Sequence, residues 1–119
     1  MKENPVQEKS YKFALKIIHL SRTLRDKGEY VIGKQLMKSG TSVGANIEEA
    51  LAGQSRADFL SKMSIASKEA RETAYWLRLL RDSDLLDINT ASGYLTEIDE
   101  LVRLLTSIVK STSNTKHTA

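Results

Sequence analysis

The chain has 119 residues, enough for one domain that buries its own core without disulfides or a structural metal. It contains no cysteine, which excludes disulfide scaffolds, zinc–thiolate sites and thiol catalysis. The formal net charge of +3 does not by itself select a class of partner. No stretch approaches the roughly 20 apolar residues of a membrane-spanning helix, and the N-terminus lacks the apolar core of a secretory signal. We therefore expect a cytoplasmic protein.

The first expected helix runs from Ser10 to Lys27, and Gly28 follows it as a stop signal. One proline, at position 5, leaves the rest of the chain free for long helices. The apolar and small residues of this segment recur at spacings of three and four, as on one face of a helix: Phe13, Ala14, Ile17, Ile18, Ser21 and Leu24.

A second helix is expected from Glu29 or Tyr30 to Leu51. Within it, Gly40 and Gly44 lie four residues apart, and a glycine in a helix interior costs roughly 1 kcal/mol relative to alanine. Such a cost is tolerated where one surface of a helix must carry no side chain. The two glycines therefore predict that a neighbouring helix packs closely against this flank.

A third helix is expected from Ser55, whose hydroxyl suits an N-cap, to Asp82. A short acidic linker follows, and a fourth helix is predicted from Asn89 or Thr90 to Lys110. Both segments carry long apolar stripes at helical spacing. The stripes include Phe59, Met63, Ala66, Ala70, Leu77 and Leu80 in the third helix, and Ile98, Leu101, Leu105 and Ile108 in the fourth.

Four amphipathic helices with short connections predict an all-α protein, an antiparallel up-down-up-down four-helix bundle. The bundle is expected to occupy residues 10–110. Residues 1–9 and 111–119 are polar and non-periodic, and are predicted to be flexible tails. A buried core that includes Phe13, Ile47, Leu77 and Leu105 is the central requirement of this architecture.

Charge is distributed unevenly along the chain. Residues 9–38 contain eight basic and two acidic side chains, whereas residues 82–100 contain six acidic and no basic ones. One interpretation is that these are solvated faces, or that they attract each other within the bundle. The alternatives are a basic surface for nucleic acid and oppositely charged faces that meet between subunits.

Three strings in the chain resemble a known family: SGTSVGANIEEA, QSRADFLSKMSIASKEARETAYWLRLL and YLTEIDELVRLLTSI. They are similar to the bacterial four-helix bundle proteins, also called the 23S rRNA intervening-sequence protein family. The resemblance covers about residues 10–110. It implies a left-handed four-helix bundle that assembles into a ring-shaped homopentamer without established enzymatic activity. A related protein that accompanies a reverse transcriptase binds nucleic acid.

The basic residues of the first two helices are the candidate nucleic-acid-binding residues. Lys and Arg bind phosphates without regard to sequence, and copies in a ring add avidity. Tyr11 and Tyr30 lie among them. The alternative function is a protein-interaction module that recruits a basic partner through the acidic residues 82–100. The candidate set is Lys9, Lys12, Lys16, Arg22, Arg25, Lys34 and Lys38.

Four residues of the second and third helices are candidates for a self-association surface: Gly44, Asn46, Tyr75 and Trp76. Asn46 has an alternative role, since an amide among small and apolar residues must find a hydrogen-bond partner, such as Ser42 or a neighbouring helix. Trp76 is an interface anchor on one interpretation and fills the core on the other.

No catalytic or metal site is predicted. A carboxylate-bridged metal centre in a helix bundle needs Glu-x-x-His pairs, and neither His19 nor His117 belongs to one. Glu48, Glu49, Glu69 and Glu72 are therefore expected to be solvated or paired with Lys and Arg. We expect neither a cofactor nor an enzymatic activity.

Overall fold

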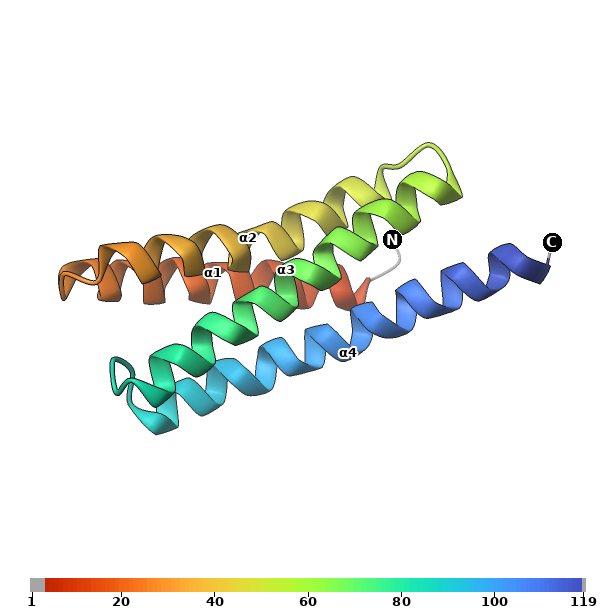
Figure 1. The fold of residues 1–119 in the computed structure, drawn as a ribbon. Helices are drawn as coiled ribbons and strands as arrows, with labels where there is room; N and C mark the ends of the chain where they lie inside the picture. Colours follow the sequence, from red (N-terminus) through yellow and green to blue (C-terminus); the bar gives the residue numbers. More distant parts are fainter. Residues whose placement is uncertain (1–3, 119) are drawn as a thin grey trace.

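The computed structural model describes residues 4–118, with side chains described for residues 4–114. Four helices make up this part of the chain: α1 (Pro5–Asp26), α2 (Tyr30–Leu51), α3 (Arg56–Asp82) and α4 (Ile88–Thr118). No strand occurs among the described residues. Consecutive helices run antiparallel and are joined by short turns, which gives an up-and-down bundle (Figure 1). The predicted all-α class and number of helices are confirmed.

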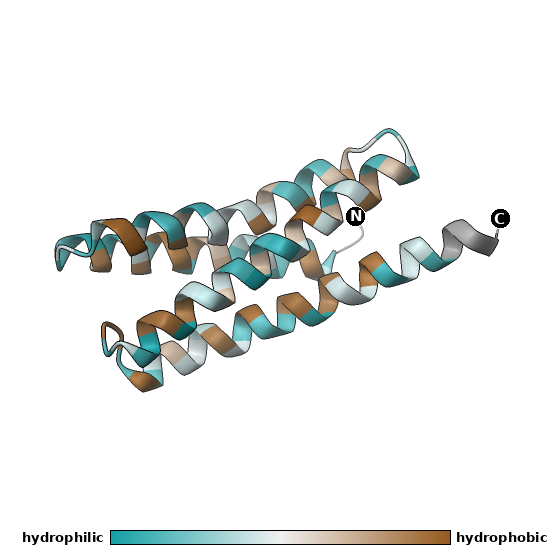
Figure 2. Cartoon of the chain, in the orientation of Figure 1, coloured by the Kyte–Doolittle hydropathy of each residue, from teal (hydrophilic) through white to brown (hydrophobic). Residues whose placement is uncertain are grey.

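The core lies along the bundle axis, where the four apolar stripes meet. Buried residues of α3 recur at alternating spacings of three and four, so one side of the helix faces inward along its length: Met63, Ala66, Ala70, Thr73 and Leu77. The hydrophobic residues follow the inner faces of the helices, and hydrophilic residues cover the outer faces (Figure 2). The four marker residues of the predicted core are all buried: Phe13, Ile47, Leu77 and Leu105.

The first helix starts earlier than predicted. The Asn4 side chain caps it by accepting a hydrogen bond from the Gln7 amide, and Pro5 occupies the first turn, where its missing N–H has no cost. Val6 extends the inward stripe and is only 5% exposed. The predicted start at Ser10 is therefore wrong, and residues 5–9, assigned to a tail, are helical.

The last helix differs from its prediction at both ends. The Asp87 carboxylate accepts hydrogen bonds from the amides of Asn89 and Thr90 and so caps α4, which begins at Ile88, one residue before the predicted Asn89 and two before Thr90. At the other end α4 continues past Lys110 to Thr118. Residues 111–118, assigned to a tail, are thus helical, and the rest of the two predicted tails, residues 1–3 and 119, lies outside the described residues.

Close packing joins α1 to α2, as the two glycines predict. A Cβ built on Gly40 would lie 2.8 Å from a side-chain carbon of Ile17, so only glycine allows this approach. Between α2 and α3, the hydroxyls of Ser39 and Thr73 share a buried hydrogen bond of 3.0 Å. The turn between α1 and α2 uses Gly28 at a φ of +85°, where other residues are strained.

The α1–α4 seam, between the first and last helices, is looser. Its contacts are fewer than those between consecutive helices, and along the described residues the backbones of the diagonal pairs α1–α3 and α2–α4 stay apart. Tyr94 crosses this seam, because its ring meets Phe13 edge-on and its hydroxyl donates to the backbone oxygen of Lys16. Burial raises the pKa of the Tyr94 hydroxyl, and the nearby Lys16 opposes that rise.

Candidate nucleic-acid interface

The basic residues of the N-terminal half of α1 are paired within the chain. Lys9 forms an ion pair with Glu100 at 3.0 Å, and Lys16 forms one with Glu97 at 2.7 Å, so both bridge α1 to α4. A hydrogen bond and the charge of Glu97 raise the pKa of Lys16. Charge attraction between the basic and acidic segments of the sequence therefore operates inside the bundle.

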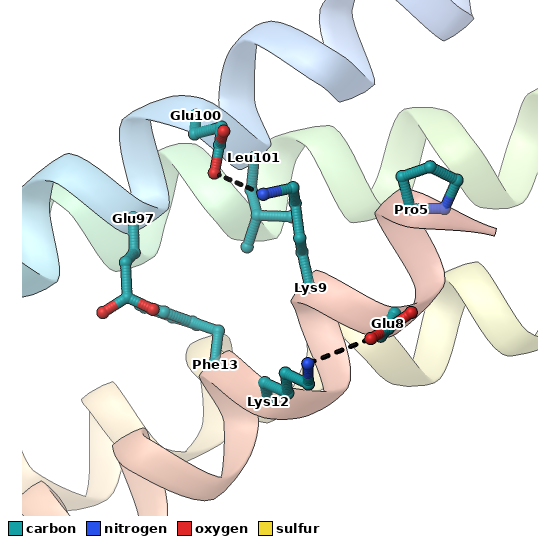
Figure 3. Close-up of a pocket in the computed structure, with 8 residues that line it drawn as sticks. All are labelled: Pro5, Glu8, Lys9, Lys12, Phe13, Glu97, Glu100 and Leu101. Atoms are coloured by element: carbon teal, nitrogen blue, oxygen red, sulfur yellow. Dashed lines mark hydrogen bonds and ion pairs between the residues drawn. The ribbon is translucent and has the colours of Figure 1, made fainter. Parts of the chain in front are cut away.

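A pocket of about 340 Å³ opens along this seam (Figure 3). Phe13 and Leu101 supply its apolar part. The Lys9–Glu100 pair spans it, and Lys12 pairs with Glu8 at 2.9 Å on the α1 side. The charges of this pocket are thus largely balanced by one another, which leaves little net field for an anionic ligand.

The other four predicted basic residues form a second group at the α1–α2 turn. All are exposed, and none makes an ion pair or a side-chain hydrogen bond with another described residue. We call this group the hairpin cations. The group consists of Arg22 and Arg25 near the end of α1, and Lys34 and Lys38 near the start of α2.

Lys38 also lies close to the α2–α3 seam. Burial and the neighbouring Glu72 raise the pKa of Glu69, and the positive charge of Lys38 partly counters this rise. Glu72 itself accepts a hydrogen bond of 3.0 Å from the indole N–H of Trp76. Lys38 is therefore a hairpin cation that lies near a carboxylate, although it forms no ion pair with it.

Beside Arg25 and Lys34 lies another pocket, of about 300 Å³. Tyr30 and Met37 provide its apolar walls, and Ser21 lies at its buried side. From the sequence, Tyr30 was noted only as an aromatic residue near basic ones, and neither Ser21 nor Met37 was assigned to a site. Their convergence depends on the register between α1 and α2, which the sequence pattern does not define.

The acidic residues 82–100 are mostly engaged inside the chain. Glu97 and Glu100 bind lysines of α1, Asp82 pairs with Arg81, and Asp87 caps α4. Hydrogen bonds from Thr90 hold the pKa of Asp87 below its usual value. The structure offers no observation that favours this segment as a docking surface for a basic partner.

Two of the residues predicted for self-association make intrachain contacts. A Cβ on Gly44 would lie 3.3 Å from the Ser10 hydroxyl, so Gly44 faces α1 of its own chain. Asn46 is half-buried, and its amide donates to the Ser42 carbonyl oxygen at 2.8 Å. The alternative in which Asn46 bonds to Ser42 is confirmed.

The aromatic pair of α3 lies at the edge between core and surface. Trp76 is half-buried against the core, whereas Tyr75 is 48% exposed and meets Trp76 edge-on at 5.2 Å. The guanidinium of Arg78 lies 5.9 Å from the centre of the Tyr75 ring. Trp76 thus contributes to the core, and Tyr75 is the more exposed of the two aromatic side chains.

Among the side chains described, those of residues 4–114, no group of three or more from His, Asp or Glu is placed to hold a metal ion. None of the four helices, over residues 4–118, is long and apolar enough to cross a membrane.

The fold and surface define a class of protein, a small four-helix bundle with charged outer faces. The chain belongs to the 23S rRNA-intervening sequence protein family, whose sequence profile matches residues 2–107. It is similar to a crystal structure of a protein of unknown function from the S23 ribosomal protein family of Bacteroides thetaiotaomicron, at 44% identity and a TM-score of 0.86. That match covers 88% of this chain and 98% of the other. No curated protein matches the chain.

These similarities confirm the family resemblance found in the sequence. Neither description names an enzymatic activity.

Proposed function

We propose that this protein is a non-enzymatic, oligomeric helical bundle of the cytoplasm that binds nucleic acid through the hairpin cations. The observation that carries the proposal is the division of the predicted basic set. Lys9, Lys12 and Lys16 have carboxylate partners, whereas the hairpin cations have none among the described residues. The proposed surface is therefore narrower than the one predicted from the sequence.

Unpaired cations bind phosphates more strongly than paired ones, because no carboxylate must be displaced first. Each phosphate contact also releases counterions, so the affinity should fall steeply with salt. Lysine and arginine side chains contact phosphates whatever the base, which favours binding without sequence preference. Several copies in one assembly would add their weak affinities.

The test compares two triple variants that each remove three positive charges. The hairpin triple is Arg22→Gln, Arg25→Gln and Lys34→Gln, and the matched control neutralises Lys9, Lys12 and Lys16. Fluorescence anisotropy with random-sequence RNA between 50 and 200 mM salt should show the hairpin triple reducing the slope of log affinity against log salt by about 2 to 3.

The control triple should change that slope much less. Equal effects of the two triples would contradict the assignment to the hairpin cations. An absence of RNA binding by the parent protein at 50 mM salt would contradict the proposed function itself.

We also propose that copies associate through the outer face of α2 and α3, in the homopentamer that the family resemblance implies. Exposed apolar side chains support this face: Val31 and Leu79 line one shallow pocket, and Tyr75 lies one turn before Leu79. Light scattering should give five times the 13.3 kDa chain mass. Tyr75→Glu with Leu79→Glu should lower it, and Leu15→Glu on the exposed side of α1 should not.

A further inference from the structure

We propose that the pocket between the end of α1 and the start of α2 binds one nucleotide unit. Its base would lie against Tyr30 and Met37, and its phosphate between Arg25 and Lys34. This inference rests on the nucleic-acid binding proposed above and specifies the chemistry of that site. A free nucleotide and an unpaired nucleotide of a single strand share this chemistry.

The first observation is a buried hydroxyl without a partner. Ser21 lines the pocket, is 8% exposed, and its Oγ finds no hydrogen-bond partner among the residues that the structure describes. A buried polar atom without a partner has lost its hydrogen bonds to water and gained none in return, so such atoms call for an explanation. A ligand that enters this pocket with a hydrogen-bonding group would provide the partner that the protein does not.

The second observation is the apolar wall. Tyr30 is the first residue of α2 and is 65% exposed, and Met37 lies two turns later beside the same pocket. Gly33 lies between them, and a Cβ there would lie 3.4 Å from the Leu24 Cβ, so the glycine lets the two helices meet closely at the base of the pocket. A nucleobase stacks on an aromatic ring whatever its sequence, and a thioether adapts to the shape of a ring beside it.

The third observation is the charge around the rim. Arg25 comes from α1 and Lys34 from α2, so the two cations approach the pocket from both helices. Glu29, also at this pocket, is the residue before α2 and makes no side-chain capping bond. Its carboxylate can accept hydrogen bonds from a base amino group or a ribose hydroxyl, while the cations take the phosphate.

The shape of the site selects an unstacked base. A pocket of about 300 Å³ admits a base that has left its neighbours, whereas a base inside a duplex presents only its edge. Single strands should therefore bind more tightly than duplexes of the same length. This preference separates the pocket from a purely electrostatic surface, which would favour the denser charge of a duplex.

The experiment measures binding of a labelled ten-nucleotide single-stranded RNA, its duplex, and AMP as a free nucleotide. We expect the single strand to bind more tightly than the duplex. Tyr30→Ala should weaken single-strand binding about 5- to 100-fold, and Tyr30→Phe should retain most of it. Tyr11→Ala, at an exposed tyrosine outside the pocket, is the matched control and should have little effect.

Ser21→Ala should have opposite effects on the stability of the unbound protein and on its affinity for the single strand. It removes the unpartnered hydroxyl, so it should raise the unfolding temperature of the unbound protein while weakening single-strand binding a few-fold. Competition by AMP for the strand would show that both sources use the pocket. AMP binding that Tyr30→Ala abolishes, without strand binding, would assign the pocket to free nucleotides.

Strand binding that is unchanged in Tyr30→Ala and no tighter than duplex binding would overturn the nucleotide pocket and leave the proposed function standing. An absence of any RNA binding by the parent protein at low salt would instead contradict the proposed function. If AMP also failed to bind, the proposed nucleotide pocket would be contradicted together with the proposed function.

Discussion

The seams between consecutive helices and the α1–α4 seam are built differently. Gly40 lets α2 approach Ile17 of α1 closely, and α2 meets α3 through the buried Ser39–Thr73 hydrogen bond. The α1–α4 seam instead has ion pairs whose side chains are about half exposed, a crossing Tyr94, and a pocket of about 340 Å³. A short turn ties consecutive helices together, whereas no connection joins α1 to α4.

This difference shows what the charges of the first and last helices do. Half-exposed ion pairs contribute little to stability, so they select which faces meet more than they hold them together. Lys9 and Lys16 thus help to close the bundle, whereas the hairpin cations form no ion pair with the described residues.

The largest expected effect is at the closely packed α1–α2 seam. Gly40→Val places carbon atoms where Ile17 lies, and overpacking of this kind costs about 1–3 kcal/mol. Gly93→Val is the matched control, because a Cβ on Gly93 meets nothing within 4 Å and valine has a slightly better helix propensity than glycine. Urea denaturation should show a clear loss for Gly40→Val only. Equal stability of the two variants would show that the α1–α2 approach is not tight.

A smaller effect is expected at the α1–α4 seam. Neutralising Lys9 and Lys16 together should reduce the free energy of unfolding by about 0.2–1 kcal/mol per pair, and the loss should shrink in 1 M salt. Exchanging the charges of one pair, Lys9→Glu with Glu100→Lys, should recover stability relative to Lys9→Glu alone. A loss that does not respond to salt would argue that the lysine stems, and not their charges, close the seam.

The smallest effect is expected from Glu69, beside the α2–α3 seam. Burial and Glu72 raise its pKa in the folded protein, so the ionised carboxylate disfavours folding at neutral pH. Glu69→Gln should therefore stabilise the protein slightly at pH 7. As the pH falls through the raised pKa towards the unfolded value, the parent takes up this proton and the difference should close. Denaturation at several pH values measures it, and a gap that widens on acidification would contradict the assignment.

The sequence predicted most of the fold because helical periodicity reports directly on burial. Leu77 and Leu105 are buried at the positions that three- and four-residue spacing predicts. The close approach of α1 to α2 at Gly40 was indicated by the absence of a side chain there. The ends of the helices were less accessible. Asn4 and Pro5 form a helix start signal, but Val6 is the only apolar core residue between them and Phe13, so the periodic pattern is weak there. At the other end, α4 continues after Lys110 through polar residues that carry no strong helical pattern.

The candidate site was predictable in its composition and not in its geometry. The sequence showed that basic and acidic segments complement each other, but the pairing of Lys16 with Glu97 depends on how α4 returns beside α1. For the same reason the basic set could not be divided into paired and unpaired members. Ser21 had the spacing of a core residue, and only the packing of α2 shows that its hydroxyl has no partner among the described residues.

The loose contact between α1 and α4 also bears on how the chain reaches its native state. Nearly all of the packing joins helices that are neighbours in the sequence, so little of it waits for the two distant ends to meet. Proteins dominated by such local contacts fold within microseconds to milliseconds. Each helical hairpin can assemble while the rest of the chain is still unstructured, and docking of the first helix against the last completes the process.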